Sequence, residues 1–258
     1  MEALYFRENG SGEDEAIVFV HGGGIGGRLW QATLNALLEY HCLAPDLPGF
    51  GKSAHITPFS SKRAAEGLAD LIRVNVPSGR AAVVGFSIGA VVCIELINRY
   101  PDLVGKAFPS GPTPRLSGVA TTVMNAIARP LLSLIGPQQR SRLVARSLGL
   151  TDDQVDEFRE DLDQLTIDLF IQINDAVAGQ RDPQANSPPA VVFAGEKELG
   201  AVKKRARQLL HALGNGKAYV VRGYGHVWCL ENPELFQRTV RAWMSGAEPG
   251  EEFVPLTK

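Results

Sequence analysis

A serine between two glycines constrains the fold of this chain more than any other feature. The segment Gly85-Phe86-Ser87-Ile88-Gly89 follows an apolar stretch, residues 81–84, and apolar residues then recur at helical spacing from Ala90 to Ile97. A strand, a tight turn and a helix in this order hold a serine at a strained backbone position and present its hydroxyl at a sheet edge. Because neighbouring chain passes close by, glycine is needed at residues 85 and 89. The pattern predicts a sheet with Ser87 as a candidate nucleophile.

The composition is that of an ordinary globular protein. The chain has 258 residues, of which 45% are hydrophobic and 21% charged, so it can build a substantial core. The net charge of −2 provides no basic field for nucleic acid or for an anionic membrane. The first eight residues lack the basic and apolar parts of a signal peptide, and no apolar run is long enough to span a bilayer. We therefore expect a cytoplasmic protein that acts on a small molecule, with no nucleic-acid or membrane partner and an unknown oligomeric state.

The cysteines and histidines do not predict a metal site. Cys42 and Cys93 lie in apolar patterns, and with Cys229 they make an odd number, which favours buried free thiols over disulfides. These residues show no close metal-ligand spacing, and Gly51-Lys52-Ser53 lacks the upstream glycine of a phosphate-binding loop. The sequence therefore predicts neither a metal nor a cofactor.

Strand and helix patterns alternate at both ends of the chain. Strands are predicted at residues 16–21, 41–45, 81–84, 190–194 and 218–221, and helices at 29–38, 61–74, 202–213 and from the cap Asn232 with Pro233 in the first turn. This alternation favours an α/β fold, in which a mainly parallel central sheet carries helices on both faces.

Residues 113–187 form a different, helical block. Strand patterns are missing there, and amphipathic stretches run from Val119 to Ile135, Gln138 to Leu148, Thr151 to Asp161 and Leu165 to Ala178, with Thr151 and Gln154 as a capping box. We expect a core domain made of residues 1–112 and 188–258, into which block 113–187 is inserted as a lid. Its apolar pairs Leu131-Leu132 and Leu134-Ile135 either line an acyl pocket or pack the block's own core.

A serine hydroxyl needs a base, and the base needs an acid that fixes its tautomer. His226 lies in a glycine-rich loop directly after the strand 218–221, which places it at the same sheet edge as Ser87. His21 is the main competitor, but its position before Gly22 suits a structural role. Glu198 follows the strand 190–194 and is the expected acid, with Glu196 as the alternative.

Attack by a serine also requires donors for the oxyanion that forms. The residue after the nucleophile, Ile88, supplies one backbone N–H. The glycine loop His21-Gly22-Gly23-Gly24 is expected to supply the other, from Gly23 or else Gly24, because its backbone is not shielded by side chains.

The same loop supports a competing interpretation. Gly22-Gly23-Gly24-Ile25-Gly26-Gly27 satisfies the dinucleotide-binding pattern G-x-G-x-x-G, and Asp46 follows where a ribose-binding acid would stand. A dinucleotide site would leave both Ser87 and His226 unexplained, so we favour the hydrolytic interpretation.

Four motifs, in chain order, resemble the α/β-hydrolase fold superfamily. They are residues 18–24, like its oxyanion strand and loop; 44–53, like its next strand and turn; 84–90, like its nucleophile elbow; and Gly225-His226 with Glu231-Asn232-Pro233, like its histidine loop. The resemblance implies that block 113–187 is a cap that roofs the active site, and that Asp46 anchors a turn. The family usually has Asp where Glu198 stands, although the longer side chain can still reach an imidazole.

The combined prediction is a serine hydrolase that cleaves a small carboxylic ester, or a related acyl compound, through an acyl-enzyme on Ser87. Two alternatives share the fold. One is a C–C bond hydrolase acting on dienoic diketones, suggested by the triple-glycine loop, and the other is a non-catalytic ligand receptor.

Overall fold

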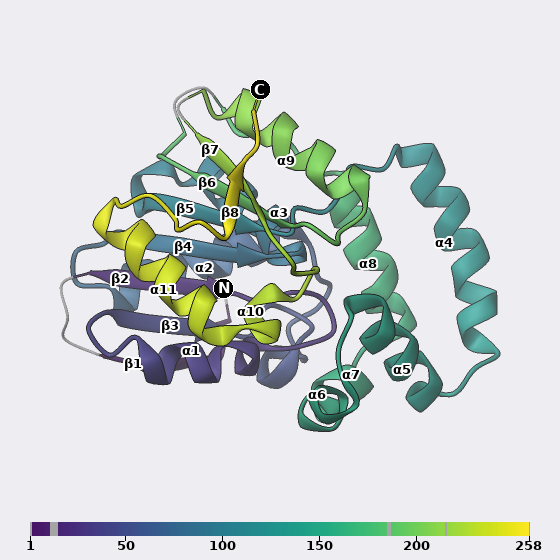
Figure 1. The fold of residues 1–258 in the computed structure, drawn as a ribbon. Helices are drawn as coiled ribbons and strands as arrows, with labels where there is room; N and C mark the ends of the chain where they lie inside the picture. The colour runs from purple at the N-terminus through teal and green to yellow at the C-terminus, as the bar shows by residue number, and fades with distance from the viewer. Residues whose placement is uncertain (1, 11–14, 185–186, 215, 258) are drawn as a thin grey trace.

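A computed structural model describes residues 2–10, 15–184, 187–214 and 216–257 (Figure 1). These residues form one eight-stranded sheet. From edge to edge its strands are β1 (Phe6–Asn9), β3 (His41–Pro45), β2 (Ala16–Val20), β4 (Ala81–Phe86), β5 (Val104–Ser110), β6 (Val191–Gly195), β7 (Lys217–Val221) and β8 (Phe253–Pro255). Neighbours from β3 to β7 pair in parallel, and only the edge strands β1 and β8 pair antiparallel. The predicted mainly parallel sheet is confirmed.

Side chains on the central strands alternate between two hydrophobic cores. On β2, Val18 and Val20 belong to one core, whereas Ile17 and Phe19 belong to the other, and all four are fully buried. Successive side chains of a strand point to opposite faces, so a sheet covered on both faces needs apolar residues at every position. This requirement explains why the strands read as continuous apolar runs.

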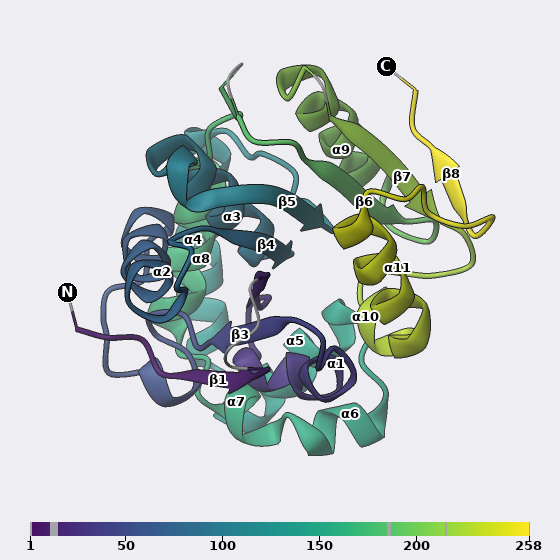
Figure 2. The same ribbon diagram turned by 90° about the vertical axis from the view of Figure 1, so that its left-hand side faces the viewer.

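Helices cover both faces of the sheet (Figure 2). The first core lies under α2 (Ser61–Asn75), α3 (Ile88–Arg99) and α9 (Gly200–Ala212), and the second under α1 (Gln31–Ala36) and α11 (Pro233–Ser245). Short elements complete the connections: the 3-10 helices η1 (Gly27–Trp30), η2 (Gly51–Ser53) and η3 (Pro101–Leu103), and α10 (Trp228–Glu231). Asn232 caps α11 by accepting a hydrogen bond from the Leu235 amide at 3.0 Å, with Pro233 in the first turn as predicted.

The helical block lies between β5 and β6. It contains α4 (Gly118–Ser133), α5 (Pro137–Leu148), α6 (Asp152–Glu157), α7 (Arg159–Asp163) and α8 (Ile167–Ala178). The single helix predicted over 151–161 is wrong, because Phe158 leaves helical geometry (φ −99°, ψ 12°) and is buried in the second core. The capping box of Thr151 and Gln154 is present.

The two apolar pairs at the end of the outer helix of the block are each divided between an exposed and a half-buried residue. Leu131 and Leu134, on α4 and just after it, are 61% and 82% exposed. Their neighbours Leu132 and Ile135 are half-buried, and Leu132 lines a pocket within the block together with Leu165 and Phe170. Figure 1 shows α4 as the outermost helix, with α8 on its inner side. In the part of the chain that the structure describes, no helix combines the length and the apolar character needed to cross a membrane.

Candidate active site

Ser87 stands at the turn between β4 and α3 in a strained conformation. Its φ of 56° and ψ of −116° lie in a region that side-chain-bearing residues rarely adopt. Its amide donates to the Ser110 carbonyl at 2.9 Å, which ties the turn to the neighbouring strand. A side chain at Gly89 would come within 2.6 Å of the His21 carbonyl oxygen, and one at Gly85 within 2.8 Å of the Cys93 Cβ. The two glycines therefore permit the close packing that fixes the turn.

His226 and Glu198 are in direct contact at the carboxyl ends of β7 and β6. The Nδ1 of His226 donates to Oε1 of Glu198, whose second oxygen accepts from the Gly195 amide at 2.8 Å. The Glu198 side chain is 3% exposed and that of His226 is 24% exposed. A buried carboxylate on Nδ1 selects the tautomer in which Nε2 is free to accept a proton.

Glu196 makes a different contact. Its Oε2 accepts from the amide of Gly223 at 2.8 Å, and so it holds the loop that carries His226. The same loop is fastened by Glu231, which accepts from the Gly225 amide at 2.9 Å. The two candidate acids are thus distinguished by geometry, since Glu198 contacts the imidazole and Glu196 contacts the backbone of its loop.

Two residues at the end of β5 complete the site, and sequence reasoning missed both. The Ser110 carbonyl accepts from Ser87, and its hydroxyl accepts from the buried Trp228 indole at 2.8 Å. A Cβ at Gly111 would lie 2.8 Å from His226 Cε1 and 3.3 Å from Glu198 Oε1. The only sequence signal for them was their place where a strand meets the helical block.

The glycine loop after β2 lies over the nucleophile turn. A Cβ at Gly22 would be 3.4 Å from the Ser87 Cβ, and one at Gly23 would be 3.9 Å from the Ile88 Cγ2. The structure therefore brings Gly23, Ile88 and Ser87 into one region. Gly24 adopts a positive φ of 86°, which favours glycine.

Aliphatic side chains of the helical block lie next to this glycine loop. A Cβ at Gly23 would meet the Ile173 Cδ1 of α8 at 3.6 Å, and one at Gly24 would meet the Val144 Cγ1 of α5 at 3.1 Å. A Cβ at Gly49 would likewise meet the Leu169 Cδ1 of α8 at 2.9 Å. The block thus reaches the residues next to Ser87 with aliphatic side chains.

His21 is buried and both its ring nitrogens are engaged. Nε2 accepts from the Leu47 amide at 2.9 Å, so Nδ1 carries the proton and donates to the Gly22 carbonyl at 2.7 Å. Burial lowers the pKa of His21 below its ordinary value of 6.5, because the charged form loses its hydration. The residue braces the glycine loop and has no free nitrogen for a substrate.

Both carboxylate oxygens of Asp46 accept hydrogen bonds within the protein. Its Oδ1 accepts from the Gly27 amide at 2.6 Å and from Arg7 at 3.0 Å, and its Oδ2 accepts from the Lys52 amide at 2.9 Å. The side chain is fully buried. A carboxylate with these partners anchors a turn and is not available for a ribose, which removes the acid that a dinucleotide site would need.

A sequence model of the Alpha/beta hydrolase family matches residues 17–239, which include the glycine loop, the nucleophile turn and the histidine loop. An AB hydrolase superfamily protein of Gibberella zeae is 29% identical over 98% of this chain and 88% of its own length. A pimeloyl-[acyl-carrier protein] methyl ester esterase of Vibrio atlanticus is 32% identical over 48% of this chain and 45% of its own length.

The fold is shared with solved structures along almost the whole chain. A putative non-heme bromoperoxidase, BpoC, from Mycobacterium tuberculosis superposes with a TM-score of 0.76 at 25% identity, over 95% of this chain and 96% of that one. An enol-lactonase from Burkholderia xenovorans superposes with a TM-score of 0.78 at 20% identity, over 94% and 96%. The strand order, the strained turn at Ser87 and the match over residues 17–239 agree: the chain belongs to the alpha/beta hydrolase family.

Proposed function

We propose that this protein is a serine hydrolase that cleaves a small carboxylic ester through an acyl-enzyme on Ser87. The observation that carries the proposal is the contact between the His226 imidazole and the buried Glu198 carboxylate, at the same sheet edge as the strained Ser87 turn. A nucleophile, a base and an orienting acid in this chain order are the parts that acyl transfer by serine requires. The esterase of Vibrio atlanticus supports the choice of an ester among acyl substrates.

In the first half-reaction, His226 Nε2 takes the proton of the Ser87 hydroxyl as its oxygen attacks the ester carbonyl. The resulting oxyanion is held by the backbone N–H groups of Ile88 and Gly23, with Gly24 as the alternative donor. The bond to the alcohol then breaks, and the alcohol leaves with the proton from His226. Glu198 stabilises the imidazolium throughout without taking a proton itself.

In the second half-reaction, water replaces the alcohol. His226 takes a proton from the water, the hydroxide attacks the acyl carbon, and Ser87 leaves with the proton. The products are a carboxylic acid and the free enzyme.

Block 113–187 acts as a cap in this proposal. Ile173, Val144 and Leu169 present aliphatic surface beside the glycine loop and Gly49. Apolar walls of this kind favour an uncharged acyl group over a charged one, because a buried charge without a partner is costly.

The proposal is tested by steady-state hydrolysis of p-nitrophenyl esters whose acyl chains run from acetyl to octanoyl. We expect measurable turnover, and a fall in kcat/KM of about 10⁴-fold or more in Ser87→Ala. Ser245→Ala, which alters an exposed serine at the end of α11, is the matched control and should keep the full rate. Turnover that survives in Ser87→Ala would reject the assignment of the nucleophile.

A further inference from the structure

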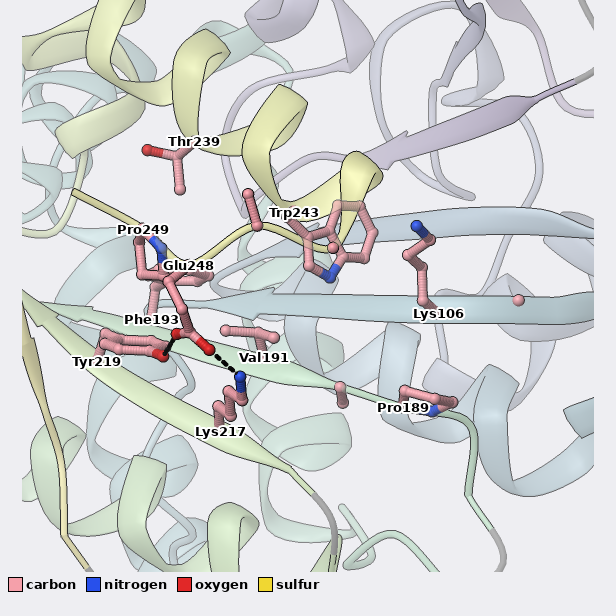
Figure 3. A pocket seen from close by; sticks show the side chains of 14 residues that line it. Lys106, Pro189, Val191, Phe193, Lys217, Tyr219, Thr239, Trp243, Glu248 and Pro249 are labelled. Carbon is pink, nitrogen blue, oxygen red and sulfur yellow. Dashed lines mark hydrogen bonds and ion pairs between the residues drawn. The ribbon is translucent and has the colours of Figure 1, made fainter.

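A cavity lies at the opposite edge of the sheet from Ser87. It has a volume of about 350 Å³, and it is formed at the amino ends of β5, β6 and β7 by residues that include Lys106, Val191 and Lys217. Helix α11 and the segment 246–249 that follows it close the other side (Figure 3). Small-molecule sites typically begin at about 300 Å³, so this space suits a compound of one or two rings.

Aromatic side chains make the body of the cavity apolar. Phe193, Tyr219 and Trp243 all line it and are between 1% and 8% exposed, so their positions are fixed by the second core behind them. Phe193 stacks on Tyr219 with ring centroids 5.7 Å apart. Rigid aromatic walls favour a flat, apolar ligand.

On one wall of the cavity the two charged side chains pair with each other. The Glu248 carboxylate pairs with Lys217 and accepts from the Tyr219 hydroxyl at 2.5 Å, as Figure 3 shows. Burial and this carboxylate raise the pKa of Tyr219 to about 12, so the phenol stays protonated. Glu248 and Lys217 therefore neutralise each other and leave no net charge on this side.

The other wall carries an uncompensated cation. Lys106 Nζ donates to the Met244 carbonyl at 2.6 Å and lies 5.6 Å from the centre of the Trp243 ring, but among the described residues it has no acidic partner. An ammonium without an acidic partner in the wall of an apolar cavity matches an anion with an apolar body.

We propose that this cavity binds a small aromatic carboxylate, whose ring lies among Phe193, Tyr219 and Trp243 and whose carboxylate accepts from Lys106. The site is independent of the ester-hydrolase proposal, because none of its residues contributes to the Ser87 site. Its test is therefore a binding measurement and does not depend on turnover.

The experiment uses 2-naphthoate as the probe and follows the indole N–H cross-peaks in an NMR titration of the full chain. The chain has three tryptophans, and the Trp243 signal is identified by its loss in Trp243→Phe. We expect the Trp243 signal to shift on titration, and the uncharged analogue 2-naphthamide to bind at least tenfold more weakly. Lys106→Met should weaken 2-naphthoate binding about ten- to hundredfold, since a charge-assisted hydrogen bond is lost.

Two further variants keep the test decisive. Lys62→Met removes an exposed lysine on α2 and should bind the probe like the unaltered protein. Val191→Trp should fill the cavity and abolish binding. The proposal is overturned if the unaltered protein leaves the Trp243 signal unmoved at millimolar probe, or if Lys106→Met binds as tightly as Lys62→Met.

Discussion

At the residue scale, the site depends on one strained backbone position. A residue held at positive φ costs roughly 1–3 kcal/mol, so the surrounding contacts must over-determine it. For Ser87 those contacts are the hydrogen bond to Ser110 and the close packing permitted by Gly85 and Gly89. Ser87 is half-buried in this conformation.

Substitution of the two candidate acids, Glu198 and Glu196, is expected to affect catalysis very differently. Glu198→Gln should lower kcat by about 10³–10⁴-fold, because the amide cannot stabilise the imidazolium and favours the wrong tautomer. Glu196→Gln is the matched control and should lower kcat by less than about tenfold, because its oxygen can still accept from Gly223. Both variants are compared by ester hydrolysis at saturating substrate. A larger loss in Glu196→Gln would move the acid to residue 196.

His21 makes stability depend on pH. Its pKa is lowered in the folded protein, so below about its ordinary value of 6.5 the unfolded chain binds a proton that the folded protein does not. Its contribution to the free energy of unfolding is therefore lost as pH falls through that value. We expect the natural protein to exceed His21→Gln in free energy of unfolding by less at about pH 5 than at about pH 7, as measured by urea denaturation. A gap that stays constant would argue against a buried, neutral His21.

At the element scale, the nucleophile turn requires close contact between α3 and β2. Gly89→Ala would place its Cβ against the carbonyl oxygens of Val20 and His21, and we expect it to destabilise the protein by about 3 kcal/mol or more. Gly118→Ala is the control, since nothing lies within 4 Å of a Cβ at the start of α4. It should change stability by less than about 1 kcal/mol. Equal thermal midpoints for the two variants would contradict the packing argument.

The sequence allowed most elements to be predicted, because their signals are local. The apolar strands, the glycines around Ser87 and the Asn232 cap each act within a few residues. What it missed depends on contacts distant in the chain. Phe158, where a predicted helix is interrupted, is buried in the second core by residues from other elements. Ser110 and Gly111 belong to the site through residues distant in the chain: Ser87 and Trp228 contact Ser110, and Glu198 lies beside Gly111. Glu196 and Glu198 are two residues apart, so only the fold could tell their contacts apart.

At the scale of the whole molecule, two continuous cores enclose the cysteines. Cys42, Cys93 and Cys229 are free thiols, and burial raises the pKa of each to about 12. We expect a disulfide reagent such as DTNB to modify none of them in the folded protein at mildly alkaline pH, and all three after unfolding in guanidinium chloride. Rapid reaction of any thiol before unfolding would mean that the core opens.

The central claim is that Ser87 is an activated nucleophile, oriented by His226 and Glu198. The most direct measurement is the intact mass of the protein after treatment with a fluorophosphonate, which reacts covalently with activated serines. The account predicts one adduct on the natural protein and none on Ser87→Ala. An unmodified natural protein, or an adduct that persists in Ser87→Ala, would contradict it.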